Sequence, residues 1–180
     1  MIIEDPDVRM LATIAATLEG DYLKPADDPC AGSPFAWLRT IQSRQRGKVG
    51  EQLVAGWCAA KGLDVTKSPD NQADRVIGGN RVEIKLSTRW ASGVYKFQQL
   101  RDQNYAYAVC LGICPFDAHC WVISKATLRK HVIGHTPQHT GKGGTDTFWL
   151  SFPTNAPPKW LAKCGGRLSA AAEILARAAK

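Results

Sequence analysis

The sequence predicts an α/β (α+β) fold in which helices flank a central mixed β-sheet. Amphipathic helical spacing dominates the first third of the chain, short apolar or alternating segments follow between residues 63 and 125, and a further helical segment ends it. A chain that mixes helices and strands in this order is expected to form one sheet with helices packed on it. The chain has 180 residues, of which 44% are hydrophobic, so it is large enough to build a sizeable core.

Helices are predicted where apolar residues recur every three to four positions. Residues 6–20 form the first helix, and the segment 21–32, rich in Pro, Gly and Asp, is a linker. Ser33 is the expected N-cap of a second helix, which continues through "GKVGEQLVAGWCAAKG" with a break near Gly47 left open. A short helix is expected at 95–103, and "GGRLSAAAEILARAAK" predicts a terminal helix.

Strands are predicted between these helices. A first strand around "LDVTKS" leads into a hairpin at residues 74–86, whose turn is rich in glycine. The apolar segments 105–113 and 119–125 are expected to be neighbouring strands joined by a turn. A long loop at 131–147 precedes "FWLSF", which predicts a last short strand.

The net charge indicates the class of partner. A formal charge of +7 favours a polyanion, and nucleic acid is the first candidate. The acidic start "MIIEDPDVRM" lacks the pattern of a signal peptide, and no apolar run approaches the ~20 residues of a membrane span. We therefore expect a cytoplasmic protein with reduced cysteines, no membrane partner and no small-molecule cofactor.

The predicted hairpin carries charges where a purely structural sheet would have neutral residues. Glu83 and Lys85 alternate with apolar neighbours, so both point to one face of their strand. A turn at "GG" places Asp74 opposite Glu83, and a turn at "GN" places it opposite Lys85. A three-residue loop sends Asp74 to the other face. Either two-residue turn therefore gathers the three charged groups on one face.

These charges suit a metal ion. Two carboxylates that face each other across a strand pair repel, and a cation between them removes the repulsion. Mg²⁺ takes one or two carboxylates and leaves positions for water and phosphate oxygens. The simpler alternative is a solvated sheet face with an ordinary Glu83–Lys85 ion pair. Glu51, at a helix start, is either a further acid of this site or a first-turn glutamate favoured by the helix dipole.

Several segments together resemble the PD-(D/E)XK nuclease superfamily. They are "GKVGE" on a helix, "SPDNQAD" before the hairpin, "VEIK" on the next strand, and the helix and strand after it. The segment "YKFQQLRDQNYAYAVCLGICP" is similar to the one after E-x-K in several type II restriction endonucleases. The resemblance implies a restriction-endonuclease-like core at 33–130. It leaves 1–32 for dimerisation or DNA contact and 131–180 for DNA recognition or dimerisation.

The resemblance also implies roles for individual residues. Asp74 and Glu83 bind the catalytic metal together with the backbone carbonyl of Ile84. Glu51 completes the acidic cluster, and Lys85 assists the attacking water, so the three acids and the lysine form the catalytic set. The literal "PD" in "SPDNQAD" offers an alternative aspartate, but it lies thirteen residues before the glutamate and does not begin a strand. The implied cofactor is Mg²⁺, with Mn²⁺ as a substitute.

Basic and amide side chains around the core are candidates for contacts with double-stranded DNA. The spacing H-x3-H-x3-H at 131–139 suggests a zinc site, but Pro and Gly interrupt the segment, so a loop that contacts DNA or is mobile is favoured. Zinc binding by the His and Cys residues stays open. The candidates are Arg44, Arg46, Lys48, Arg89, Lys96, Gln98, Gln99, Arg101, His135, His139 and Lys142.

The favoured function is a Mg²⁺-dependent DNA endonuclease of the type II restriction kind. Polar segments at 131–160 lie outside the resembling region and are suited to base contacts, and a homodimer would match a palindromic site. One alternative is a structure-specific nuclease resembling Holliday junction resolvases, or a repair nuclease. Another is a non-catalytic DNA-binding module on a nuclease scaffold, which has no use for an acidic pair near phosphate.

Overall fold

The structure is a computed structural model, and it describes residues 30–138 and 146–179 of the chain. Contacts divide the chain into two compact units, Met1–Gly32 and Ser33–Lys180, and the elements below belong to the second. The helix predicted at 6–20 lies outside the described residues. In the described parts of the chain, no helix combines the length and the apolar character that a membrane crossing requires.

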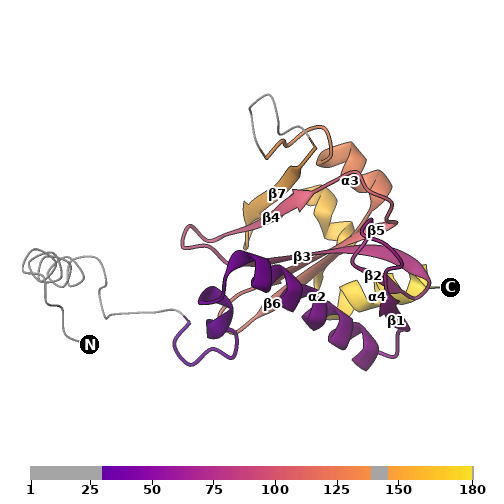
Figure 1. The fold of residues 1–180 in the computed structure, drawn as a ribbon. Coiled ribbons are helices and arrows are strands. Elements are labelled where there is room, and N and C mark those ends of the chain that lie inside the picture. The colour runs from indigo at the N-terminus through magenta and orange to yellow at the C-terminus, as the bar shows by residue number, and fades with distance from the viewer. Residues whose placement is uncertain (1–29, 139–145, 180) are drawn as a thin grey trace, which may run out of the picture. The chain divides into compact units, whose positions relative to one another are not determined.

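A six-stranded mixed sheet forms the centre of the fold, in the order β1-β2-β3-β5-β6-β8 (Figure 1). All neighbouring strands are antiparallel except β3 and β5, which run parallel. The predicted mixed sheet is thus confirmed. Its strands are β1 (Val65–Lys67), β2 (Arg75–Ile77), β3 (Asn80–Thr88), β5 (Tyr107–Ile113), β6 (Ala118–Ser124) and β8 (Gly165–Arg167).

Two helices, α2 (Ser43–Ala60) and α4 (Leu168–Ala178), cover one face of this sheet. Their buried side chains, such as Val54 and Leu175, join the inward-pointing strand residues in one apolar cluster. The predicted terminal helix is present, but the "GGR" that was expected to begin it forms β8, and α4 begins at Leu168. The sheet and its flanking helices therefore have the predicted layered arrangement.

The helix predicted from Ser33 is divided into two pieces. The Ser33 hydroxyl accepts a hydrogen bond from the backbone N–H two residues on (3.0 Å) and precedes a 3-10 turn, η1 (Ala36–Arg39). After a short gap α2 begins, passes through Gly47 without interruption and ends before Gly62, whose φ of +77° suits glycine. The break therefore lies before α2 and not at Gly47.

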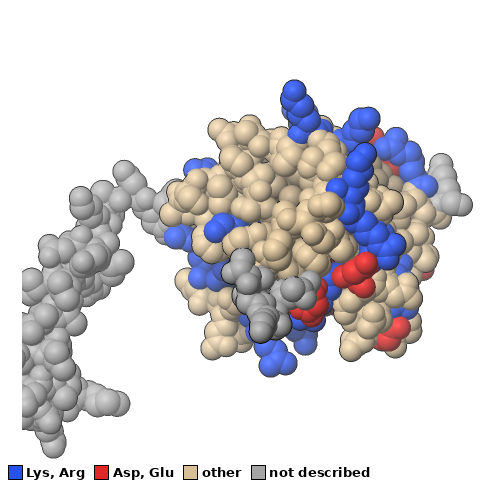
Figure 2. Space-filling model, turned by 90° about the horizontal axis from the view of Figure 1, so that it is seen from above, with Lys and Arg blue, Asp and Glu red and all other residues tan. Residues whose placement is uncertain are grey.

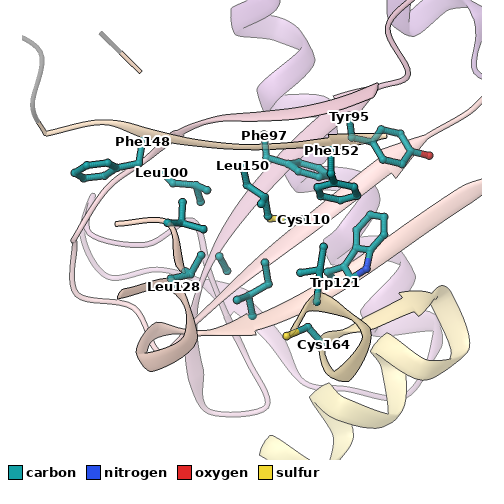
Figure 3. Packing of buried hydrophobic residues seen from close by; sticks show 14 of the residues in the cluster. Tyr95, Phe97, Leu100, Cys110, Trp121, Leu128, Phe148, Leu150, Phe152 and Cys164 are labelled. Atoms are coloured by element: carbon teal, nitrogen blue, oxygen red, sulfur yellow. The ribbon is translucent and has the colours of Figure 1, made fainter. Parts of the chain in front are cut away.

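A second sheet of two antiparallel strands, β4 (Val94–Leu100) and β7 (Phe148–Pro153), packs on the other face. Its inward side chains surround Trp121 of β6, and Phe152 meets that ring edge-on with the centroids 5.0 Å apart (Figure 3). The short helix predicted at 95–103 is therefore wrong. Alternate residues of β4 are buried in this aromatic cluster, which favours a strand.

Short helices complete the unit. The sequence did not predict α3 (Lys125–His131), which Ser124 caps by accepting a hydrogen bond from the backbone N–H of Thr127 (3.2 Å). A 3-10 turn, η2 (Lys159–Cys164), leads from β7 into β8. The part of the chain after residue 146 thus adds strands to both sheets.

Candidate active site

A cleft of about 710 Å³ lies along β3. The pairing of β2 with β3 stops at Arg75↔Val82, so the remainder of β3 has a free edge on this side. The start of α2 and the outer part of β4 contribute the walls of the cleft. Nine residues singled out from the sequence line it, namely Arg44, Arg46, Glu51, Asp74, Ile84, Lys85, Lys96, Gln98 and Gln99.

The hairpin turn decides how the charged residues face each other. Ile77 pairs with Asn80, so the turn is at "GG", and both glycines have positive φ, as a two-residue hairpin turn requires. The backbone N–H of Asp74 donates to the carbonyl of Val82 (3.0 Å). This pairing places Asp74 opposite Glu83, which is the first of the arrangements considered from the sequence.

Asp74 is fixed to the free edge of β3. Its Oδ2 atom accepts a hydrogen bond from the backbone N–H of Ile84 (2.7 Å). The N–H and C=O groups of one strand residue point to the same side of the strand. The carbonyl oxygen of Ile84 therefore lies along the same edge as the Asp74 carboxylate, where the cleft opens.

Glu83 and Lys85 form an ion pair under the cleft. The Lys85 Nζ atom lies 2.6 Å from Glu83 Oε1, and Glu83 is only 6% exposed. Burial raises the pKa of Glu83, and the neighbouring Asp74 carboxylate raises it further, whereas Lys85 lowers it. A buried acid beside a second acid is costly for folding and typical of functional sites.

Glu51 comes to this site from α2. Its neighbour Gly50 packs so closely on β3 that a Cβ atom there would lie 2.5 Å from the Leu86 Cβ, so glycine permits the approach of the helix. Burial raises the pKa of Glu51, and the charge of Asp74 raises it further. The Arg75 guanidinium lies 3.3 Å from Glu51 Oε2 and balances part of this charge.

Arg75 is a member of the site that the sequence analysis missed. It also donates to the backbone carbonyl of Asp74 (2.7 Å), so one side chain ties β2 to the acid on α2. Its position directly after Asp74 was the available signal. Ser87 was missed as well, although it lies two residues after Lys85 on the same strand face and its hydroxyl accepts a hydrogen bond from the Lys96 N–H (2.9 Å).

The donor set fits a metal ion that shares its coordination with water. Among the residues that the structure describes, no three His, Cys, Asp or Glu side chains are grouped so that they alone would enclose a metal. The carboxylates of Asp74 and Glu83 with the Ile84 carbonyl supply oxygen atoms of the kind Mg²⁺ binds, and the open cleft leaves room for water and phosphate. A zinc or calcium cage, with more protein ligands, does not match this set.

The alternative aspartate in "SPDNQAD" takes no part in the cleft. Asp70 is exposed and pairs with Arg81, whose hydrogen bond lowers the pKa of the Asp70 carboxyl. Asp74 is thus the aspartate that meets Glu83.

The remaining DNA-contact candidates divide into two groups. Arg44 of α2 and Lys96 of β4 both line the cleft, and the Lys96 Nζ lies 4.3 Å from the centre of the exposed Trp90 ring. Arg46 lines the cleft too, but it donates to the Ile41 carbonyl (3.0 Å), so it holds the segment before α2. The candidates that do not line the cleft are Lys48, Arg89, Arg101 and His135, whereas His139 and Lys142 lie outside the described residues.

The two described histidines of the H-x3-H-x3-H spacing do not form a common site. His131 stacks on Trp160, with ring centroids 4.5 Å apart, whereas His135 is exposed. Cys110 is buried, which raises the pKa of its thiol to about 12 and disfavours the thiolate that a metal needs. His131 and Cys110 thus serve packing.

The chain shares its fold with a solved structure described as a bacterial homing endonuclease. That structure, I-Ssp6803I, matches with a TM-score of 0.51 and 13% sequence identity, and the match covers 77% of this chain and 97% of that chain. No protein-family model matches the sequence, and no curated protein matches it either. The likeness establishes a common fold, so the chemistry of this chain is argued from its cleft.

Glu83→Gln is expected to raise the melting temperature at pH 7 in EDTA. A raised pKa in the folded state means that stability falls as pH rises above about 4.3, the ordinary value for glutamate. The amide has no charge to bury and still accepts a hydrogen bond from Lys85. A gain on the order of 1 kcal/mol, or about 2–4 °C, is expected, and it should vanish near pH 4. Glu173→Gln, at an exposed position of α4, is the control. Equal melting temperatures at both pH values would contradict the prediction.

Proposed function

We propose that the protein is a metal-dependent endonuclease that hydrolyses phosphodiester bonds in double-stranded DNA. The observation that carries the proposal is that Asp74 and Lys85 line an open cleft at the free edge of β3, with Glu83 buried beneath them and paired with Lys85. The shared fold with a protein described as a homing endonuclease supports it. A non-catalytic DNA-binding module would not explain why Glu83 is buried next to Asp74, where burial raises its pKa.

The residues of the cleft have distinct roles in this proposal. Asp74, Glu83 and the Ile84 carbonyl would hold Mg²⁺ or Mn²⁺, with Glu51 near them. The ion would supply electrostatic stabilisation of the charge that develops on the phosphate. Lys85, held by Glu83, orients the attacking water through its ammonium group and adds positive charge near the phosphate oxygens.

Basic side chains around the cleft would hold the DNA backbone. Arg44 and Lys96 both line it, and the net charge of +7 favours a polyanion. On the face shown in Figure 2, Lys and Arg side chains form separate clusters around a broad neutral area. Binding to duplex DNA should therefore weaken as the salt concentration rises. A homodimer would bring two such clefts to the two strands of one site.

Digestion of a supercoiled plasmid tests the proposal. With Mg²⁺ and the full chain we expect nicked and linear DNA, and sequencing of the ends shows whether they share a short motif. A common motif supports sequence-specific cleavage of the restriction or homing kind. Random ends, or cutting confined to four-way junctions, favour a repair nuclease or a resolvase. Intact plasmid and junction DNA over a range of salt and metal concentrations would contradict nuclease function.

A further inference from the structure

The outer part of β4 has an irregularity that faces the cleft. Phe97 pairs with Leu150 and Leu100 pairs with Phe148, so between these pairs β4 has two residues where β7 has one. The two β4 residues that fall between these pairs are Gln98 and Gln99. A bulge of this kind turns side chains away from the regular alternation, and bulges are frequent beside active sites.

The backbone at this bulge is held in a conformation that is rare for its residue type. Gln99 has a φ of +56°, and it is the one non-glycine residue with positive φ in the described chain. Its backbone N–H donates to the side-chain oxygen of Gln138 (2.8 Å), which fixes the bulge from the segment before β7. Such strain persists where the surrounding structure supports it, and it is concentrated at functional sites.

The bulge presents amide groups and not charges to the cleft. Gln98 and Gln99 are exposed, and both line the cleft that also contains Asp74 and Lys85. The neighbours Phe97 and Leu100 are fully buried, so the backbone on either side is anchored in the aromatic core (Figure 3). The two amides are therefore carried on a rigid support next to the reaction centre.

An amide side chain of this kind suits a base edge better than a phosphate. Phosphate oxygens are bound mainly by Arg and Lys, which the cleft already supplies, whereas a glutamine offers one donor and one acceptor side by side. In the major groove adenine presents the complementary pair, the N6 amino group and N7, and glutamine binds them in a bidentate manner.

We propose that Gln98 and Gln99 are specificity-determining residues that recognise adenine in the major groove of duplex DNA near the bond that is cut. The inference rests on the proposed nuclease function and names the element of the chain that selects the sequence. Gln138 acts as a positioning residue, because its side chain holds the N–H of Gln99.

Binding selection with a randomised duplex library tests this inference without relying on cleavage. The full chain, Gln98→Ala and Gln99→Gly are incubated with the library in a Ca²⁺ buffer, and bound DNA is sequenced. Glycine is chosen at position 99 because it accepts positive φ without strain. Gln52→Ala is the control, since Gln52 is an exposed glutamine of α2 that does not line the cleft.

We expect the wild-type chain and the control to enrich one motif that contains adenine. Each cleft variant should lose about tenfold of its preference at one adenine position, while its affinity for an unrelated duplex changes less than about twofold. A motif that both variants retain, or an equal loss of affinity for all sequences, would overturn the inference. Duplex binding without any enriched motif would overturn it too and leave the nuclease proposal intact. A chain that neither binds nor cuts DNA would instead overturn the proposed function.

Discussion

Glu83→Ala and Lys85→Ala are each expected to lose DNA cleavage by about a thousandfold or more, while the proteins stay folded and bind DNA. Glu83 is buried and holds the Lys85 ammonium at 2.6 Å, so either change removes a group to which the proposed function assigns a role at the metal or the attacking water. Losses of this size are typical when one preorganised charge is removed from a reaction centre. The measurements are the initial rate of plasmid cleavage and the binding of a labelled duplex.

The two aspartates before the hairpin provide a matched pair for the same assay. Asp74→Ala should be as inactive as the Glu83 variant, because Asp74 meets the free edge of β3 through its hydrogen bond to Ile84. Asp70→Ala removes an exposed carboxylate that pairs with Arg81, and it should keep activity within about threefold of wild type as expected for surface changes. Full cleavage by Glu83→Ala would contradict the assignment of these residues to the active site. Loss of cleavage in Asp70→Ala together with retained cleavage in Asp74→Ala would contradict it as well.

Cleavage should disappear in EDTA and return with Mg²⁺ or Mn²⁺, with a change of at least about a thousandfold between the two conditions. Ca²⁺ should support DNA binding with little cutting, because its coordination is larger and less regular than that of Mg²⁺. The cause lies in the donor set, which gives an ion a few oxygen ligands and leaves the rest to water and phosphate. Undiminished cutting in excess EDTA would rule this mechanism out.

Thermal unfolding gives a second measure of metal binding that does not depend on activity. Mg²⁺ at about a hundred times its dissociation constant should stabilise the wild-type chain by about 2.7 kcal/mol. Asp74→Ala should show much less of this shift, whereas Asp70→Ala should show all of it. Equal shifts in both variants would place the ion elsewhere in the chain.

The two sheets differ in how well the sequence predicted them. The longer strands of the main sheet are apolar or alternating, so their pattern indicated them directly, whereas the three-residue β8 was taken as the start of the terminal helix. β4 was mistaken for a helix because its buried residues, Tyr95, Phe97 and Leu100, change spacing at the bulge, and the glutamines between them are typical of helices. α3 was missed because it is short and its apolar residue, Leu128, is isolated among charged ones.

The charged part of the candidate site was predictable because its members are close in sequence. Asp74 and Glu83 lie on either side of one tight turn, so strand alternation with either two-residue turn brought them to one face, and the observed "GG" turn places them opposite each other. Arg75 and Gln138 were not predictable in their roles. Their contacts depend on how α2 and β7 pack against the hairpin and the bulge, which no local pattern contains.

The pairing of β4 with β7 has a consequence for the newly synthesised chain. β4 leaves the ribosome well before β7, and until residues 148–153 follow, its buried aromatic face has no partner strand. The acidic hairpin, whose contacts are local, forms early, but one wall of the cleft is completed by the last third of the chain. A ribosome-bound chain that ends before β7 would therefore carry Asp74 and Glu83 on a hairpin whose cleft still lacks the strand that supports one wall.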